Sequence, residues 1–140
     1  MWSHYADNHQ GICLEFESEI LAESFKLNAY EVSYSESIPS PNSNGLGDYL
    51  LNKSKDWSYE KEVRFYEIIS PWENGSAVGK RQFDPAALTG VIFGYKINRE
   101  NYKRYYDFAK SLNPECRIFR SYKIDGKYAL YAKELSVDTL

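Results

Sequence analysis

Alternating hydrophobic and polar residues recur in short runs along this chain, and they predict β-strands. Tyr, Val, Phe and Ile are frequent in these runs, and such residues favour a pleated, half-buried surface. The run VIFGY at 91–95 is apolar throughout, which is typical of a strand buried on both faces. The predicted strands cover residues 11–17, 27–35, 57–69, 91–95, 116–124 and 128–135.

Other segments carry apolar residues at steps of three and four, which predict helices. The clearest begins after Asn98, places Tyr102, Tyr105 and Tyr106 on its apolar side, and stops before Asn113. Asp84 followed by Pro85 predicts the start of a single helical turn. Shorter helices are predicted over residues 18–25 and 46–55, and a loop over 36–45.

These elements together predict an α+β fold with a mixed, largely antiparallel sheet and a few short helices. The strand at 91–95, the helix after Asn98 and the strand at 116–124 form one β-α-β unit near the C-terminus. Asp125-Gly126 predicts a hairpin turn, and a second hairpin-like pair is expected between 57–70 and 81–84. A length of 140 residues fits a single domain spanning residues 1–140.

Composition and charge narrow the classes of protein that fit. A hydrophobic content of 43% is enough for a packed core, so disorder is disfavoured. The net charge of −3 disfavours general binding to nucleic acid or to a membrane. No apolar stretch is long enough for a membrane-spanning helix, and the first residues lack the pattern of a signal peptide. Cys13 and Cys116 lie in apolar runs, so we expect two buried thiols in a cytoplasmic protein.

Three residues near the start, His4, His9 and Cys13, are of types that ligate metals. Their spacing of five and four residues does not match a zinc pattern, so we predict packing and hydrogen bonding instead of a metal site. In this interpretation Trp2 and Tyr5 anchor the first turn and His4 binds a backbone group. The chain has neither a phosphate-binding glycine loop nor a nucleophile elbow.

The strongest catalytic candidates are Glu60 and Glu62, which a strand would place about 6–7 Å apart on one face with Arg64. One carboxylate can hold a ribose hydroxyl and stabilise an oxocarbenium-like transition state, while the other orients the acceptor. Arg64 can bind a phosphate with two hydrogen bonds. The alternative is a solvated strand face with a Glu–Arg pair.

A second charged pattern interleaves basic and aromatic residues on one predicted strand. Arg117, Arg120 and Lys123 alternate with Phe119 and Tyr122. Such a strand can stack on and neutralise a single-stranded nucleic acid, provided that the three basic residues share an uncovered face. The alternative is an amphipathic strand with a basic face toward solvent, which the acidic whole chain favours.

Three blocks of this sequence resemble domain of unknown function family 2971, which is largely bacterial. They are MWSHYADNHQGICLEF at 1–16, WSYEKEVR at 57–64 and FDPAALTGVIFG at 83–94. Family members usually have a further segment before the first block. The resemblance therefore implies a C-terminal portion, or a member shortened at its N-terminus. The family has no established activity.

The E-x-E pattern with a separate His-Tyr pair is also similar to NAD-using ADP-ribosyltransferases. That likeness implies Glu60 or Glu62 as the catalytic carboxylate, with His4 and Tyr5 facing the nicotinamide or its ribose. The ligand-binding residues would be Trp2, Trp57, Tyr59 and Arg64. The reaction requires the carboxylates and the His-Tyr pair to converge in one cleft.

Two other functions fit the same sequence. One is a non-catalytic ligand- or protein-binding module that presents its tyrosine-rich sheet to a small molecule, a nucleotide or a protein. The other is a nucleic-acid-interacting defence or mobile-element protein, which the acidic charge disfavours.

Overall fold

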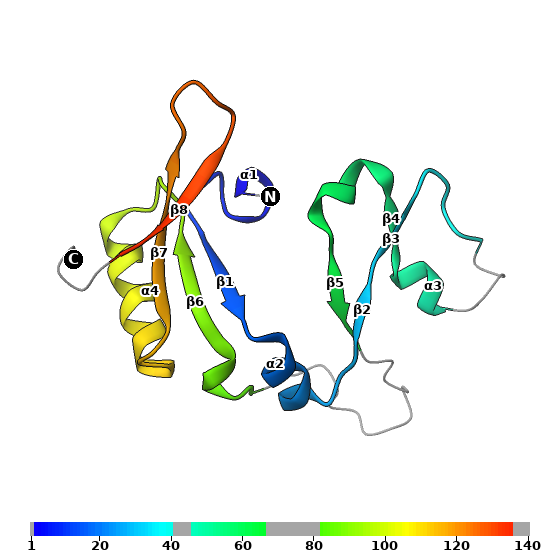
Figure 1. Cartoon of the computed structure of the whole chain (residues 1–140), viewed down its shortest axis with the longest axis horizontal. Helices are drawn as coiled ribbons and strands as arrows, with labels where there is room; N and C mark the ends of the chain where they lie inside the picture. The colour runs from blue at the N-terminus through cyan, green and yellow to red at the C-terminus, as the bar shows by residue number, and fades with distance from the viewer. Residues whose placement is uncertain (1, 41–45, 67–81, 136–140) are drawn as a thin grey trace. The chain divides into compact units, whose positions relative to one another are not determined.

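The computed structural model describes residues 2–40, 46–66 and 82–135. The chain divides into two compact units (Figure 1). Unit 1 comprises Met1–Leu21 and Phe83–Leu140, and unit 2 comprises Ala22–Gln82. The boundary falls within helix α2 (Ser18–Phe25), which has the bounds that the sequence predicts. A single domain over residues 1–140 stays a prediction.

Unit 1 is built on a four-stranded sheet with the order β1-β6-β7-β8. Strand β1 (Ile12–Phe16) pairs antiparallel with β6 (Leu88–Phe93). Strand β7 (Arg117–Lys123) runs parallel to β6, and β8 (Leu130–Glu134) returns antiparallel to β7. The predicted α+β fold with a mixed, largely antiparallel sheet is therefore confirmed.

The connection between β6 and β7 is the predicted β-α-β unit. Helix α4 (Arg99–Leu112) fills it and packs along the sheet (Figure 1). The Asn98 side chain caps this helix by accepting a hydrogen bond of 2.8 Å from the Asn101 backbone N–H. At the other end, the Asn113 side-chain amide donates to the Leu88 carbonyl at 3.0 Å, which ties the end of the helix to the start of β6.

The core of unit 1 surrounds β6, whose residues are mostly buried. The apolar run at 91–95 predicts this burial, but the strand spans Leu88–Phe93 and so includes Thr89 and Gly90. Phe93 has no exposed surface, and its ring centroid lies 4.5 Å from that of Tyr102 on α4. Cys116 is buried as predicted, while Cys13 is only half-buried. The rest of the buried cluster consists of Leu88, Val91, Ile97, Ala109 and Ile118. Asp84 caps the short 3-10 helix η2 (Pro85–Ala87), which is the predicted single turn.

Unit 2 is made of short elements. Strand β2 (Ala29–Glu31) pairs antiparallel with β5 (Val63–Phe65), and β3 (Ser33–Ser35) pairs parallel with β4 (Asn52–Ser54). Helix α3 (Leu46–Leu50) precedes β4, and the 3-10 helix η1 (Lys55–Glu60) follows it.

The strand predicted over 57–69 is wrong in its first half, because residues 57–60 belong to η1 and only residues 63–65 form a described strand. The Ser54 side chain caps η1 by accepting from the Asp56 backbone N–H. Lys61 ends it in the left-handed conformation, with a φ of 46°. Local capping therefore overrides the period-two pattern, and residues 67–69 lie outside the described part of the chain.

Three further predictions for unit 2 need correction. The strand predicted over 27–35 is two strands, because Val32 is buried between β2 and β3 and these pair with different partners. The helix predicted over 46–55 ends at Leu50, since residues 52–54 form β4. Strand β5 pairs with β2 instead of forming a hairpin with 81–84, although residues 67–81 lie outside the described ranges. For the loop predicted over 36–45, residues 36–40 form neither helix nor strand, and residues 41–45 lie outside the described ranges.

Within the described residues, none of the helices has the length and apolar character needed to cross a membrane.

Candidate functional site

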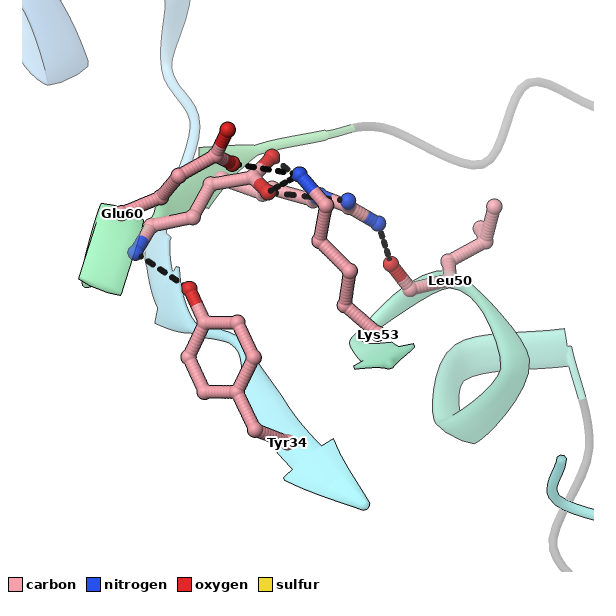
Figure 2. A network of polar contacts seen from close by, with 6 residues as sticks. Tyr34, Leu50, Lys53 and Glu60 are labelled. Carbon is pink, nitrogen blue, oxygen red and sulfur yellow. Dashed lines mark hydrogen bonds and ion pairs between the residues drawn. The ribbon is translucent and has the colours of Figure 1, made fainter. Parts of the chain in front are cut away.

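The predicted catalytic segment forms a compact polar site in unit 2, which we name the four-charge cluster: Lys53, Glu60, Glu62 and Arg64 (Figure 2). Lys53 is on β4, Glu60 is the last residue of η1, Glu62 precedes β5, and Arg64 is the middle residue of β5. The elements β4, η1 and β5 thus contribute one charged side chain each, and the turn before β5 contributes the fourth.

Lys53 is the centre of the cluster. Its Nζ lies 2.5 Å from Glu60 Oε2 and 3.1 Å from Glu62 Oε2, so one ammonium group contacts both carboxylates. The same Nζ lies 5.1 Å from the centroid of the Trp57 ring, within the range of a cation–π contact. The hydrogen bond to Glu60, followed by that to Glu62, raises the pKa of Lys53 well above its ordinary value. Lys53 is therefore a permanent cation.

Arg64 donates two hydrogen bonds to the Glu62 carboxylate. Its Nε lies 2.6 Å from Oε1 and its second terminal nitrogen 3.1 Å from Oε2, and its remaining terminal nitrogen donates to the Leu50 carbonyl. These bonds lower the pKa of Glu62 and raise that of Arg64, because each stabilises a charged form. The Tyr34 hydroxyl accepts from the Glu62 backbone N–H at 2.8 Å. Arg64 and Lys53 thus hold the Glu62 side chain as a carboxylate, while Tyr34 bonds its backbone.

The left-handed turn at Lys61 explains how two residues that are not on one strand reach the same cation. Lys61 has a φ of 46° and its backbone N–H donates to the Ser58 carbonyl at 3.3 Å. A side-chain-bearing residue in this conformation costs about 1–3 kcal/mol, and neighbouring contacts must offset that cost. The two carboxylates on either side of Lys61 supply those contacts through Lys53.

The cluster leaves one acceptor open. Its two cations and two carboxylates balance, and both oxygens of Glu62 are engaged. By contrast, Glu60 Oε1 is buried and has no hydrogen-bond partner among the described residues. The Glu60 side chain is only 9% exposed, so this oxygen lies in a protected position. An open, oriented carboxylate oxygen can accept a hydrogen bond from a hydroxyl group.

Sequence reasoning missed two members of this site, Lys53 and Tyr34. Lys53 falls within the helix predicted over 46–55, whereas it lies on β4. The available signal was electrostatic, since two half-buried carboxylates need a cation close by. Tyr34 was predicted only as a strand residue, and its hydroxyl partner is 28 positions away.

Of the other predicted site residues, Trp57 lies at the four-charge cluster, where its ring meets Lys53. Trp57 and Tyr59 are on η1 with their ring centroids 6.0 Å apart, and Tyr59 is exposed. Trp2, His4 and Tyr5 belong to helix α1 (Trp2–Tyr5) of unit 1. The rings of His4 and Tyr5 meet edge-on with centroids 6.5 Å apart, and both side chains are exposed. Because the catalytic candidates are divided between the two units, their convergence in one cleft stays a prediction.

The basic strand is partly neutralised. Arg117 forms two hydrogen bonds with Glu134, of 3.0 and 2.7 Å, and its guanidinium lies 4.7 Å from the Phe119 ring centroid. Alternation along β7 places Arg117 and Lys123 on one face and Arg120 on the other. The nucleic-acid hypothesis requires the three basic side chains to share one face, and they do not. Across the described residues, no group of three or more His, Cys, Asp or Glu side chains is placed to hold a metal ion.

Comparison with known proteins finds a family model that is similar to the first part of the chain. Residues 1–65 match the family model described as "Protein of unknown function (DUF2971)". The match confirms the resemblance drawn from the first two sequence blocks and includes all four residues of the four-charge cluster. The third block, at 83–94, lies beyond the matched residues. No curated protein and no solved structure matches the chain.

Proposed function

We propose that unit 2 belongs to an NAD-binding, ADP-ribosyltransferase-like domain in which Glu60 accepts a hydrogen bond from a ribose hydroxyl. One observation carries this proposal: Glu60 Oε1 is a buried carboxylate oxygen without a partner among the described residues.

The arrangement suits the chemistry in three ways. Lys53 fixes the other oxygen of Glu60 at 2.5 Å, so the carboxylate is oriented before a ligand arrives. Burial strengthens any hydrogen bond that Oε1 accepts. A carboxylate bonded to the ribose stabilises the positive charge that develops on the sugar as its bond to nicotinamide breaks.

Isothermal titration of NAD into the full chain tests the proposal. We expect NAD to bind, and Glu60→Gln to weaken binding about tenfold because a hydrogen bond to a charged group is lost. Lys53→Met should weaken binding as well, since Glu60 loses its anchor. Glu36→Gln is the matched control, because Glu36 is an exposed carboxylate that pairs with Lys55 at 2.9 Å outside the cluster.

Two results would contradict the proposal: absence of NAD binding to the wild-type chain, or equal affinity in the wild-type and Glu60→Gln proteins. Circular dichroism of each variant establishes that a loss of binding is not a loss of folding.

A second candidate function is a non-catalytic ligand- or protein-binding module, and the saturation of Glu62 and Arg64 favours it. Both oxygens of Glu62 and all three guanidinium nitrogens of Arg64 already have partners, so this half of the cluster serves the fold. This candidate predicts that NAD incubated with the protein releases no nicotinamide. It also predicts that Glu60→Gln lowers the melting temperature without changing the affinity for any ligand.

A further inference from the structure

A pocket of about 740 Å³ lies within unit 1. One wall is α1 and the turn that follows it, and the other is the end of the β7–β8 hairpin, which lies beside α1 (Figure 1). Its volume is in the range of small-molecule sites. Its lining residues include Trp2, His9, Tyr95, Lys123 and Lys127.

Aromatic rings form a continuous row in this pocket. The rings of Trp2 and His9 are nearly parallel, at 13°, with centroids 6.4 Å apart. The His9 ring then lies 4.8 Å from the ring of Tyr95. Three π-faces in sequence offer a flat ligand a surface on which to stack.

Backbone contacts hold the turn that carries His9 against the end of β6. His9 has a φ of 70°, and its carbonyl accepts a hydrogen bond of 3.1 Å from the Lys96 N–H. The Gly94 N–H donates to the Gly11 carbonyl at 3.0 Å, and a Cβ on Gly94 would lie only 2.1 Å from the His9 carbonyl oxygen. This close approach fixes His9 against the end of β6. The backbone that carries its ring is therefore set before any ligand binds.

The charge of the pocket is positive. Lys123 and Lys127 line it, and none of its lining residues is acidic. The Lys123 ammonium lies 4.8 Å from the centroid of the Tyr95 ring, so cation and stacking surface are adjacent. Burial, aided by Lys96 and Lys123, lowers the pKa of His9, which keeps its ring neutral. His9 Nδ1 is buried and has no hydrogen-bond partner in the described part of the chain.

We propose that this pocket binds a nucleoside phosphate, with the base stacked on the Trp2–His9–Tyr95 row and the phosphate beside Lys123 and Lys127. An aromatic surface next to ammonium groups recognises both halves of such a ligand. No residue of the four-charge cluster lines this pocket, and the inference does not depend on the transferase proposal.

Titration of AMP into the full chain, followed by calorimetry at low salt, tests this inference. We expect AMP to bind, adenosine to bind about tenfold more weakly, and inorganic phosphate more weakly still, because each retains only one half of the interaction. Lys123→Gln should weaken AMP binding about fivefold to tenfold, and Trp2→Leu should weaken AMP and adenosine alike. Lys103→Gln, on the exposed side of α4, is the matched control and should bind AMP as the wild type does.

Three results would overturn the inference. They are absence of AMP binding, AMP affinity that Lys123→Gln and Trp2→Leu leave unchanged, and binding of a short single-stranded oligonucleotide without binding of AMP. Because AMP is also a part of NAD, the loss of AMP affinity in Lys123→Gln and Trp2→Leu is the result that assigns AMP binding to this pocket and separates this test from that of the NAD proposal.

Discussion

Among single residues, Glu62 is the one on which the four-charge cluster most depends. It bonds to both cations, Lys53 and Arg64, and its backbone N–H donates to Tyr34. Its side chain is 28% exposed, so solvent screens these ion pairs only in part. Neutralising this carboxylate would leave two neighbouring cations with one counter-charge between them.

The lowered pKa of Glu62 predicts how stability changes in acid. In the folded protein, the bonds from Arg64 hold this pKa below its ordinary value of 4.5. The unfolded chain therefore takes up the proton first as pH falls, and the stabilisation present above 4.5 is lost as pH falls through the lower folded pKa. We expect the urea-unfolding midpoint of the wild type to drop more steeply below pH 4.5 than that of Glu62→Gln. Glu31→Gln, an exposed change on β2, should keep the steep dependence because Glu62 remains. Equal slopes in the wild type and Glu62→Gln would contradict the assignment.

At the scale of elements, the sequence predicts those whose pattern and boundary signals agree. Helix α4 has both an apolar stripe and the Asn98 cap, and β6 contains most of the apolar run at 91–95, so both elements were predictable, although β6 spans Leu88–Phe93 instead of 91–95. The run at 57–69 was mispredicted because its alternation competes with a cap at Ser54 and a left-handed Lys61, which no pattern reveals. Glu60, Glu62 and Arg64 were still identified as a group, since they are close in sequence. Lys53 was not, because its contacts with them depend on the path of the chain.

The junction between β6 and the N-terminal turn is the element-scale feature with the least tolerance for change. A methyl group on Gly94 would meet the His9 carbonyl oxygen at 2.1 Å, and this neighbour is backbone, which yields only if the turn moves. We expect Gly94→Ala to lower the free energy of unfolding by about 1–3 kcal/mol, measured by urea denaturation.

Gly94→Ala should also weaken AMP binding, because His9 is part of the proposed stacking row. Gly47→Ala is the control, since its added methyl group would lie at an ordinary 3.5 Å from the Tyr66 hydroxyl. Wild-type stability in Gly94→Ala would show that the turn is not fixed at this point.

Across the whole molecule, burial is distributed unevenly between the two units. Of the buried hydrophobic residues in the described ranges, Val32 alone lies in unit 2, and the core cluster around β6 lies in unit 1. Unit 2 relies on three-residue strands in two-stranded pairs, which are marginal alone, and on the ion pairs of the four-charge cluster. A polar network that stabilises a small unit is specific in geometry but contributes less than an apolar core of the same size.

This asymmetry predicts where the protein opens most readily, and hydrogen–deuterium exchange can measure it. Backbone amides of β6 and the parallel strand β7 should exchange more slowly than those of β2 and β5, by about a factor of ten or more, because their hydrogen bonds break only when the buried cluster opens. Lys53→Met should speed exchange in β5 and leave β6 unchanged, since only the former depends on the four-charge cluster. Equal protection in the two units would mean that the cluster stabilises unit 2 as strongly as the apolar core stabilises unit 1. In that case the open oxygen of Glu60 would be better explained as a by-product of a structural network than as a binding group.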